Sequence, residues 1–166
     1  MTDIRSLWCA LVCGALVATN AGAVDVGERA PSFALPTAAG DSVSLEHMRG
    51  RVVYVDFWAS SSAPCRRSFP WMSRIQGELG PDGFIVIAVN VDHAYADAER
   101  FLEAHIPRFG IVFDPHGRLA AKFGVRDIPT SFLIDRGGHI RWKHEGFRLA
   151  DRDRLERRIR SSVLAH

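Results

Sequence analysis

The sequence is short of cysteine, of excess charge of either sign and of long hydrophobic runs. Its 166 residues include three cysteines, and an odd number does not suit a scaffold held together by internal disulfides. The 21 Lys and Arg residues nearly balance the 19 Asp and Glu residues, for a net charge of +2, so no nucleic-acid partner is expected. With 47% hydrophobic residues, the chain suits one compact domain with its own core.

The first 23 residues have the layout of an export signal. An apolar run, Leu7–Ala18, is followed by the small-residue cleavage site Ala21-Gly22-Ala23. The run is shorter than the roughly 20 apolar residues that a membrane-spanning helix needs, and no other segment is long enough. We therefore expect a signal peptide over residues 1–23 and a single domain over 24–166, with no stable membrane span after cleavage. An uncleaved anchor is the alternative.

Cleavage at this site would divide the three cysteines unequally. Cys9 and Cys13 would leave with the signal peptide, and Cys65 would be the one cysteine of the remaining domain. Exported proteins occupy compartments where disulfides form readily. A lone thiol there is either buried and inert or reacts with something outside its own chain.

Strand-like and helix-like segments alternate along the rest of the chain. Runs of β-branched and aromatic residues indicate buried strands, and Gly137-Gly138 indicates a hairpin between the last two strands. The expected strands are 32–35, 42–45, 51–58, 84–91, 111–113, 130–135 and 140–144, and the expected helices are 65–79, 96–105, 119–123 and 149–164. This order predicts an α/β protein with a mixed central sheet and helices on both faces.

Residues Asp56–Pro70 read DFWASSSAPCRRSFP. This segment resembles the thioredoxin fold, and in particular the exported TlpA/ResA-like thiol-disulfide oxidoreductases, which usually show FWAxWCxPC here. Gly50–Val53 resembles the family's lead-in to its central strand, and Ile128-Pro129-Thr130 resembles its cis-proline segment. The resemblance implies a thioredoxin fold with an N-terminal β extension, a βα insertion at 84–105, and location in the bacterial periplasm.

The sequence departs from that family at the chemically important position. Ser62 stands where the family has its first cysteine, and Ser61 where it has a tryptophan. The family reaction needs a thiolate at a helix N-terminus to attack a disulfide, and a second thiol to resolve the intermediate. A serine hydroxyl forms no disulfide. Any residual thiol chemistry therefore rests on Cys65, which occupies the second, resolving position.

Three interpretations of Cys65 stay open. In the first, Cys65 is a buried apolar residue in a non-enzymatic module that binds a partner. In the second, it is a one-cysteine redox site that forms mixed disulfides with protein thiols or disulfides, or with a low-molecular-weight thiol such as glutathione. In the third, it is a peroxidase site. The last interpretation follows a resemblance to peroxiredoxins, which carry T/S-x-x-C, although they have proline where Trp58 stands. Candidates for the activating arginine of a peroxidase are Arg66, Arg67 and Arg126.

The thioredoxin resemblance also implies roles for residues around the motif. Asp56 matches a buried aspartate that lies beneath the second cysteine and exchanges a proton with it; the alternative is a carboxyl bound to water or backbone. The cis-proline segment of the family pairs with an extended substrate backbone. The expected catalytic residues are Cys65, Ser62 and Asp56, and the expected substrate-binding residues are Ile128, Pro129, Thr130 and Trp58.

The remaining features point to no further chemistry. The seven histidines include no H-x-x-x-H pair on one helix, so we expect no metal, and no cofactor is expected either. Arginine and acidic residues alternate near the end of the chain, over 148–160, and we interpret them as a solvated, salt-bridged helix face. We expect a monomer.

Overall fold

The structure is a computed structural model that describes residues 24–165. The expected signal peptide, residues 1–23, lies outside the described residues. Among the described residues, no helix is long and apolar enough to cross a bilayer.

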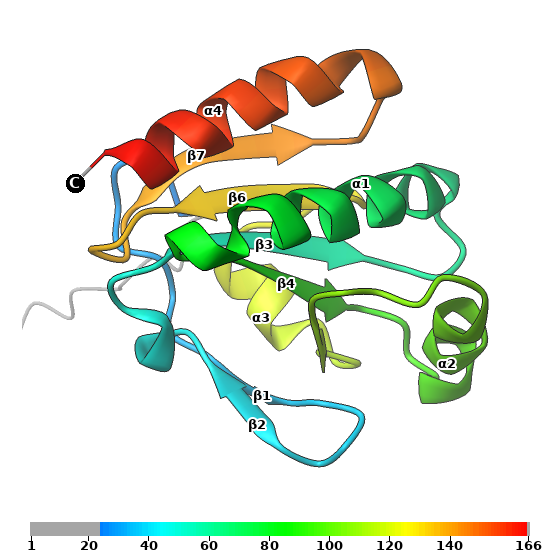
Figure 1. Cartoon of the computed structure of the whole chain (residues 1–166). Helices are drawn as coiled ribbons and strands as arrows, with labels where there is room; N and C mark the ends of the chain where they lie inside the picture. The colour runs from blue at the N-terminus through cyan, green and yellow to red at the C-terminus, as the bar shows by residue number, and fades with distance from the viewer. Residues whose placement is uncertain (1–23, 166) are drawn as a thin grey trace, which may run out of the picture.

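A five-stranded sheet forms the centre of the molecule, in the order β5-β4-β3-β6-β7 (Figure 1). Its strands are β3 (Val52–Trp58), β4 (Phe84–Asn90), β5 (Gly110–Phe113), β6 (Thr130–Ile134) and β7 (Ile140–Glu145). β3, β4 and β5 run parallel to one another, whereas β6 is antiparallel to both of its neighbours, β3 and β7. The predicted mixed sheet is confirmed.

Helices cover both faces of this sheet, as predicted. The longest are α1 (Ala63–Leu79) and α4 (Arg152–Leu164), which lie side by side on one face in Figure 1, with α2 (Tyr95–Ala104) at the edge of the same layer and α3 (Arg118–Lys122) behind the sheet. Successive side chains of a strand point to opposite faces. On β3, therefore, Tyr54 and Trp58 pack under α1, whereas Val55 and Phe57 pack towards α3.

A small antiparallel hairpin precedes the main sheet. It consists of β1 (Ala34–Pro36) and β2 (Ser42–Ser44), so its first strand begins two residues later than predicted. Three short 3₁₀ turns complete the structure, at Glu46–Met48, Gly80–Asp82 and Leu149–Asp151. The hairpin between β6 and β7 turns at Asp135–Gly138, where the Gly138 N–H donates to the Asp135 carbonyl at 2.9 Å. Gly138 has φ +84°, a conformation that favours glycine.

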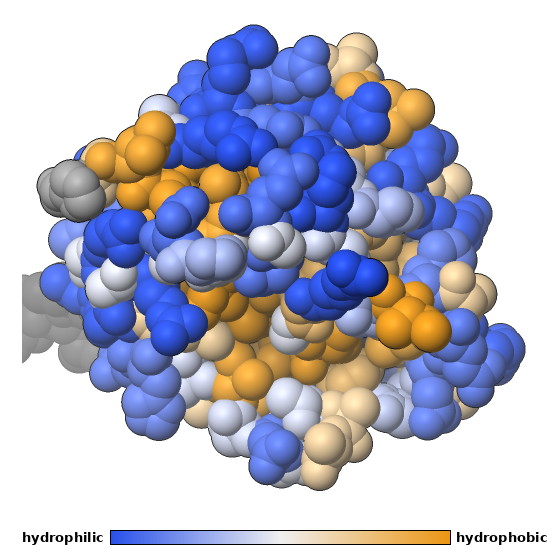
Figure 2. Space-filling model, in the orientation of Figure 1, coloured by the Kyte–Doolittle hydropathy of each residue, from blue (hydrophilic) through white to orange (hydrophobic). Residues whose placement is uncertain are grey.

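The interface between α1 and α4 is polar at its rim. Glu156 of α4 accepts a hydrogen bond from the indole N–H of Trp71 at 2.9 Å and pairs with Arg74, and Arg160 pairs with Glu78. The arginine-rich helix is therefore partly salt-bridged, and three of its side chains, Leu155, Ile159 and Val163, are buried against the sheet. Figure 2 shows the mostly hydrophilic surface of this face, interrupted by apolar patches. Within residues 24–165, the exposed large apolar side chains are Val26, Tyr95, Ile106, Leu149 and Leu164.

Candidate functional site

The S-x-x-C motif joins the end of β3 to the start of α1. Ser62 is the N-cap of α1, and its hydroxyl oxygen accepts a hydrogen bond from the backbone N–H of Cys65 at 3.4 Å. Serine is a favoured residue at this position because its oxygen pairs with one of the free N–H groups of the first helical turn. The helix consequently begins at Ala63 rather than at Cys65, two residues earlier than predicted. The hydroxyl oxygen of the half-buried Ser62 thus lies at the N-terminus of α1, one turn before the sulfur of Cys65.

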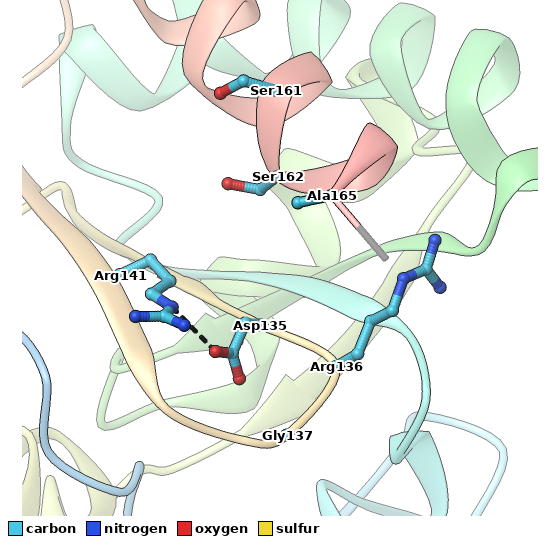
Figure 3. Close-up of a pocket in the computed structure, with 7 residues that line it drawn as sticks. All are labelled: Asp135, Arg136, Gly137, Arg141, Ser161, Ser162 and Ala165. Atoms are coloured by element: carbon cyan, nitrogen blue, oxygen red, sulfur yellow. Dashed lines mark hydrogen bonds and ion pairs between the residues drawn. The ribbon is translucent and has the colours of Figure 1, made fainter.

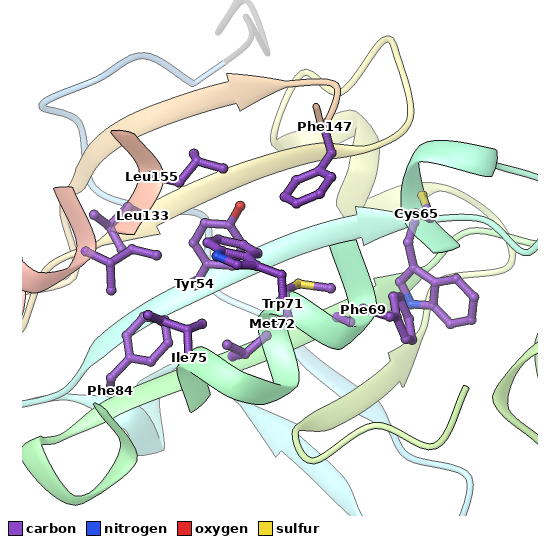
Figure 4. Packing of buried hydrophobic residues seen from close by; sticks show 14 of the residues in the cluster. Tyr54, Cys65, Phe69, Trp71, Met72, Ile75, Phe84, Leu133, Phe147 and Leu155 are labelled. Carbon is purple, nitrogen blue, oxygen red and sulfur yellow. The ribbon is translucent and has the colours of Figure 1, made fainter. Parts of the chain in front are cut away.

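The thiol of Cys65 is shielded from solvent. The residue is 0% exposed and forms no disulfide, and it lies at the end of the apolar cluster near Phe69 (Figure 4). Burial, with a smaller contribution from the negative charge of Asp56, raises the pKa of Cys65 to about 11, although a hydrogen bond with Ser62 opposes the shift. A thiol with such a pKa is almost entirely protonated at neutral pH, and the protonated form is a poor nucleophile.

Asp56 lies on β3, on the face covered by α1, and is 2% exposed. Its Oδ2 atom has no hydrogen-bond partner among the described residues. Because burial disfavours the charged carboxylate, the pKa of Asp56 is raised well above its ordinary value. The same carboxyl influences the pKa of Cys65 and of Tyr54 through its charge. The role of Asp56 as a proton-exchanging partner of Cys65 stays a prediction.

Asp56 should make the stability of the protein pH-dependent. Because its pKa is higher in the folded than in the unfolded state, the folded state binds more protons above about pH 4, and stability falls as pH rises towards the folded pKa. We expect the free energy of unfolding of the wild type to fall relative to Asp56→Asn by up to about 1.4 kcal/mol per pH unit. Urea unfolding of both proteins between pH 4 and pH 8 measures this difference, and parallel curves would contradict it.

Trp58 lies in the core of the structure. It is 0% exposed and packs with ring centroids 4.8 Å from both Phe69 and Phe101. Its indole N–H has no partner among the described residues. A substrate contact with Trp58 would require these neighbouring rings to move, so in this conformation its contribution to the site is to pack beneath the motif.

The Ile128-Pro129-Thr130 segment lies at the start of β6, and the Ile128–Pro129 peptide bond is cis. Thr130 is 0% exposed and is flanked within the sheet by Phe57 of β3 and Glu145 of β7. Its backbone is therefore not at a free edge. Within residues 24–165, by contrast, neither the N–H nor the C=O of Ile128 forms a hydrogen bond, and its side chain is only half-buried.

Two polar residues that the sequence analysis did not single out hold the motif loop in place. Asp92 accepts a hydrogen bond from the backbone N–H of Ser60 at 3.0 Å and another from the side chain of Asn90 at 2.8 Å. Asn90, 1% exposed, ends β4 directly beside the end of β3. The signal was present in the sequence, since Asn90 lies near the end of a predicted strand, 84–91, and Asp92 directly follows it. Parallel neighbouring strands bring their carboxyl ends to the same edge of a sheet.

A hollow lies at the opposite end of the sheet from the motif. It has a volume of about 430 Å³, between the β6–β7 hairpin and the end of α4 (Figure 3). Its charged side chains are engaged: Arg141 pairs with Asp135 at 2.7 Å, and Arg136 donates to the carbonyls of Gly50 and Val163. Residues 24–165 contain no cluster of three His, Cys, Asp or Glu side chains placed to hold a metal ion.

Arginine does not activate the thiol in this structure. Arg66 donates to the carbonyl oxygen of Ser60 at 3.2 Å, and Arg67 and Arg126 are exposed. None of the three is among the groups that set the pKa of Cys65. A peroxidatic cysteine has to be a thiolate to react, so this geometry disfavours the peroxidase interpretation.

Comparison with known proteins agrees with this architecture. Residues 26–143 match the model of the AhpC/TSA family. The chain is 33% identical over 120 residues to the thiol-disulfide oxidoreductase ResA of Halalkalibacterium halodurans, covering 72% of this chain and 68% of that protein, and 34% identical over 123 residues to ResA of Geobacillus thermodenitrificans, covering 74% and 71%.

Solved structures show the same fold. A Chlorobium tepidum structure named as a thiol:disulfide interchange protein DsbE has a TM-score of 0.83 and 46% identity, covering 85% of this chain and 99% of that one. The exposed lipoprotein thioredoxin Etrx1 of Streptococcus pneumoniae has a TM-score of 0.70 and 28% identity, covering 79% and 99%. These matches confirm the predicted thioredoxin fold. The chain belongs to the AhpC/TSA family, as a thioredoxin-fold homologue of the ResA thiol-disulfide oxidoreductases.

Proposed function

We propose that this protein acts in thiol–disulfide redox chemistry through a single sulfur, that of Cys65, on a polypeptide partner held beside the motif. The observation that carries the proposal is the position of Ile128. Its free backbone N–H and C=O lie at the start of β6, and β6 pairs with the strand that leads into the motif. An extended segment of a partner binds well to such unpaired backbone groups.

The surface beside the motif also contains a hollow, which Ile128 does not line. This hollow of about 300 Å³ lies between Ser61 and Arg66 on one side and, on the other, Arg100 of α2 and His105, the residue that follows α2. Arg66 donates to the Ser60 carbonyl and Arg100 pairs with Asp97. The remaining N–H groups of these two exposed arginines are donors for the carbonyl groups or carboxylates of a bound chain. The proposed partner is therefore a polypeptide that carries a thiol or disulfide, and the proposed substrate-binding residues are Ile128 and Pro129.

The proposed reaction is one disulfide exchange. The Cys65 thiol loses its proton, and the thiolate attacks one sulfur of the partner disulfide. A mixed disulfide forms with Cys65 while the other partner sulfur leaves as a thiolate and takes up a proton. A thiol of the partner, or a small thiol, then attacks the mixed disulfide and releases Cys65. Asp56, whose charge influences the pKa of Cys65, is the proposed group that exchanges the proton, which it accepts in its ionised form.

A second candidate function is favoured by the burial of Cys65. A thiol that is 0% exposed with a raised pKa is also what a non-enzymatic, partner-binding module would contain. In that case Ile128 would hold the partner and no covalent bond would form. The two functions share one binding surface and differ only in whether Cys65 reacts.

A disulfide-bearing peptide and oxidised glutathione distinguish the candidates. We expect the peptide to form an adduct at Cys65, detected by mass spectrometry, faster than glutathione does, because only the peptide pairs with Ile128. Ile128→Pro removes the N–H donor and should slow the peptide reaction about fivefold, the value of one hydrogen bond. Ile128→Val, which keeps the donor, is the matched control.

The two candidate functions predict different outcomes of this experiment. Cys65→Ser should abolish the adduct. Peptide binding without an adduct would support the non-enzymatic module, and an absence of both binding and adduct would contradict either function.

The proposed location is the bacterial periplasm, with residues 1–23 as a signal peptide and 24–166 as the exported domain. The signal layout of the sequence supports this. So does the similarity to Etrx1, which is named as an exposed lipoprotein.

A further inference from the structure

A second cavity lies on the opposite face of the sheet from Cys65. It has a volume of about 350 Å³ and is formed between the β1 strand of the hairpin, with the residues just before it, and α3. The hairpin forms the lower edge of the molecule in Figure 1, and α3 lies behind the sheet. Phe33 and Leu119 line this cavity and belong to the core cluster on that face, whereas Cys65 belongs to the cluster on the other face. The cavity is therefore separate from the motif.

The floor of this cavity is apolar. Phe33 and Leu35 contribute from the β1 segment, and Leu119 contributes from α3. Phe113 also borders the cavity, but its ring packs against Tyr95, with centroids 4.7 Å apart, and belongs to the cluster on the other face. A volume of about 350 Å³ falls within the range of pockets that hold small molecules, which are lined mainly by apolar and aromatic side chains. The floor thus suits the apolar body of a small ligand.

The rim of the cavity is basic. Arg118 and Lys122 are four residues apart on α3, which places them on one side of the helix, and both line the cavity together with His116. All three are exposed, and none forms an ion pair with an acidic residue in the described part of the chain. Two basic side chains therefore border the cavity without an ion-pair partner among residues 24–165.

The one acidic residue in the lining does not neutralise this rim by direct pairing. Asp114 is 4% exposed, and its carboxylate accepts three backbone N–H groups of α3, those of Arg118 at 2.9 Å, Leu119 at 2.8 Å and Ala120 at 2.9 Å. Both oxygens are already used as acceptors for the start of the helix. Arg118 and Lys122 are left free to bind an anion from outside the chain.

We propose that this cavity binds a small amphipathic anion, an aliphatic carboxylate whose chain lies on the apolar floor and whose head group pairs with Arg118 and Lys122. The combination excludes two other ligand types. A fully polar anion would gain nothing from the floor formed by Phe33 and Leu35, and an amphipathic cation would face two like charges. The site is independent of Cys65 and of the proposed redox function.

Titration calorimetry with decanoate on the purified protein tests this binding. We expect saturable one-to-one binding that weakens about fourfold for each methylene removed from the chain, as octanoate and hexanoate would show. Decanol and decyltrimethylammonium should bind at least tenfold more weakly than decanoate. Equal binding of the three decyl compounds, or an affinity independent of chain length, would overturn the proposal.

Charge reversal at the rim provides the matched variant. The double variant Arg118→Glu and Lys122→Glu should lose at least tenfold in affinity for decanoate and should prefer decyltrimethylammonium. A control with the same change in net charge, Arg152→Glu and Arg157→Glu on the exposed side of α4, should bind decanoate as the wild type does.

Circular dichroism checks that both double variants fold. If the rim variant unfolds, the single variant Lys122→Gln, at an exposed position, should still weaken decanoate binding about threefold. Unchanged binding in the folded rim variant would overturn the site.

Discussion

Ser62→Cys is expected to give this protein disulfide reductase activity. The new sulfur would stand at the N-cap of α1, half-buried and one turn before Cys65. A thiol at a helix N-terminus has a pKa between about 3.5 and 7.5, compared with about 8.5 for a free thiol, so much of it would be ionised at neutral pH. Because Cys65 would then resolve the mixed disulfide, we expect insulin reduction to rise at least about a hundredfold above the wild type.

Three variants show whether the gain comes from that sulfur in that place. Ser62→Ala removes the cap hydroxyl without adding a thiol, so it should lose about 1 kcal/mol of stability and gain no activity. Ser61→Cys places a sulfur one residue earlier, on an exposed residue outside the helix, and should gain little. Adding Cys65→Ser to Ser62→Cys should abolish turnover. A folded Ser62→Cys protein without reductase activity would mean that Ser62 is not the only obstacle to the two-cysteine reaction.

The thiol of the wild-type protein is expected to react very slowly with alkylating reagents at neutral pH. With a pKa of about 11, about one Cys65 in 10⁴ is a thiolate at pH 7, compared with about 3% for a thiol of pKa 8.5. The rate with iodoacetamide should therefore be about 300-fold below that of the urea-unfolded protein. It should rise about tenfold per pH unit until the protein unfolds or the pH approaches 11.

Asp56→Asn is the informative variant for this measurement. The negative charge of Asp56 is the second largest cause of the raised pKa of Cys65, after burial. At a pH high enough for Asp56 to be ionised, removing its charge should speed alkylation without removing the need for deprotonation. A wild-type rate close to that of the unfolded protein would show that Cys65 is far more exposed than the structure indicates.

Several features followed from residue patterns of short range. The β-branched run Val52–Val55 and the spacing of apolar residues in Cys65–Leu79 are sufficient to predict a buried strand and a helix, and the alternation of such segments predicts a mixed sheet. The replacement of a sulfur by Ser62 is also visible from residue identity alone. No conformation of the backbone can give a hydroxyl the chemistry of a thiol, so this limit on the reaction is set by the sequence.

Packing decides whether Cys65 and Asp56 ionise and whether Trp58 reaches the surface. Whether Cys65 and Asp56 ionise depends on how far α1 and the sheet exclude water from them, and Trp58 is withdrawn from the surface by aromatic rings that come from α1 and α2. These contacts join residues distant in sequence, so no local pattern encodes them. The unpaired backbone groups of Ile128 and the basic cavity beside α3 also depend on tertiary structure. Each is set by which strand or helix lies next to it in the fold. The residues present determine which reactions the chain is able to perform, and the tertiary structure determines which of their groups are charged, buried or accessible.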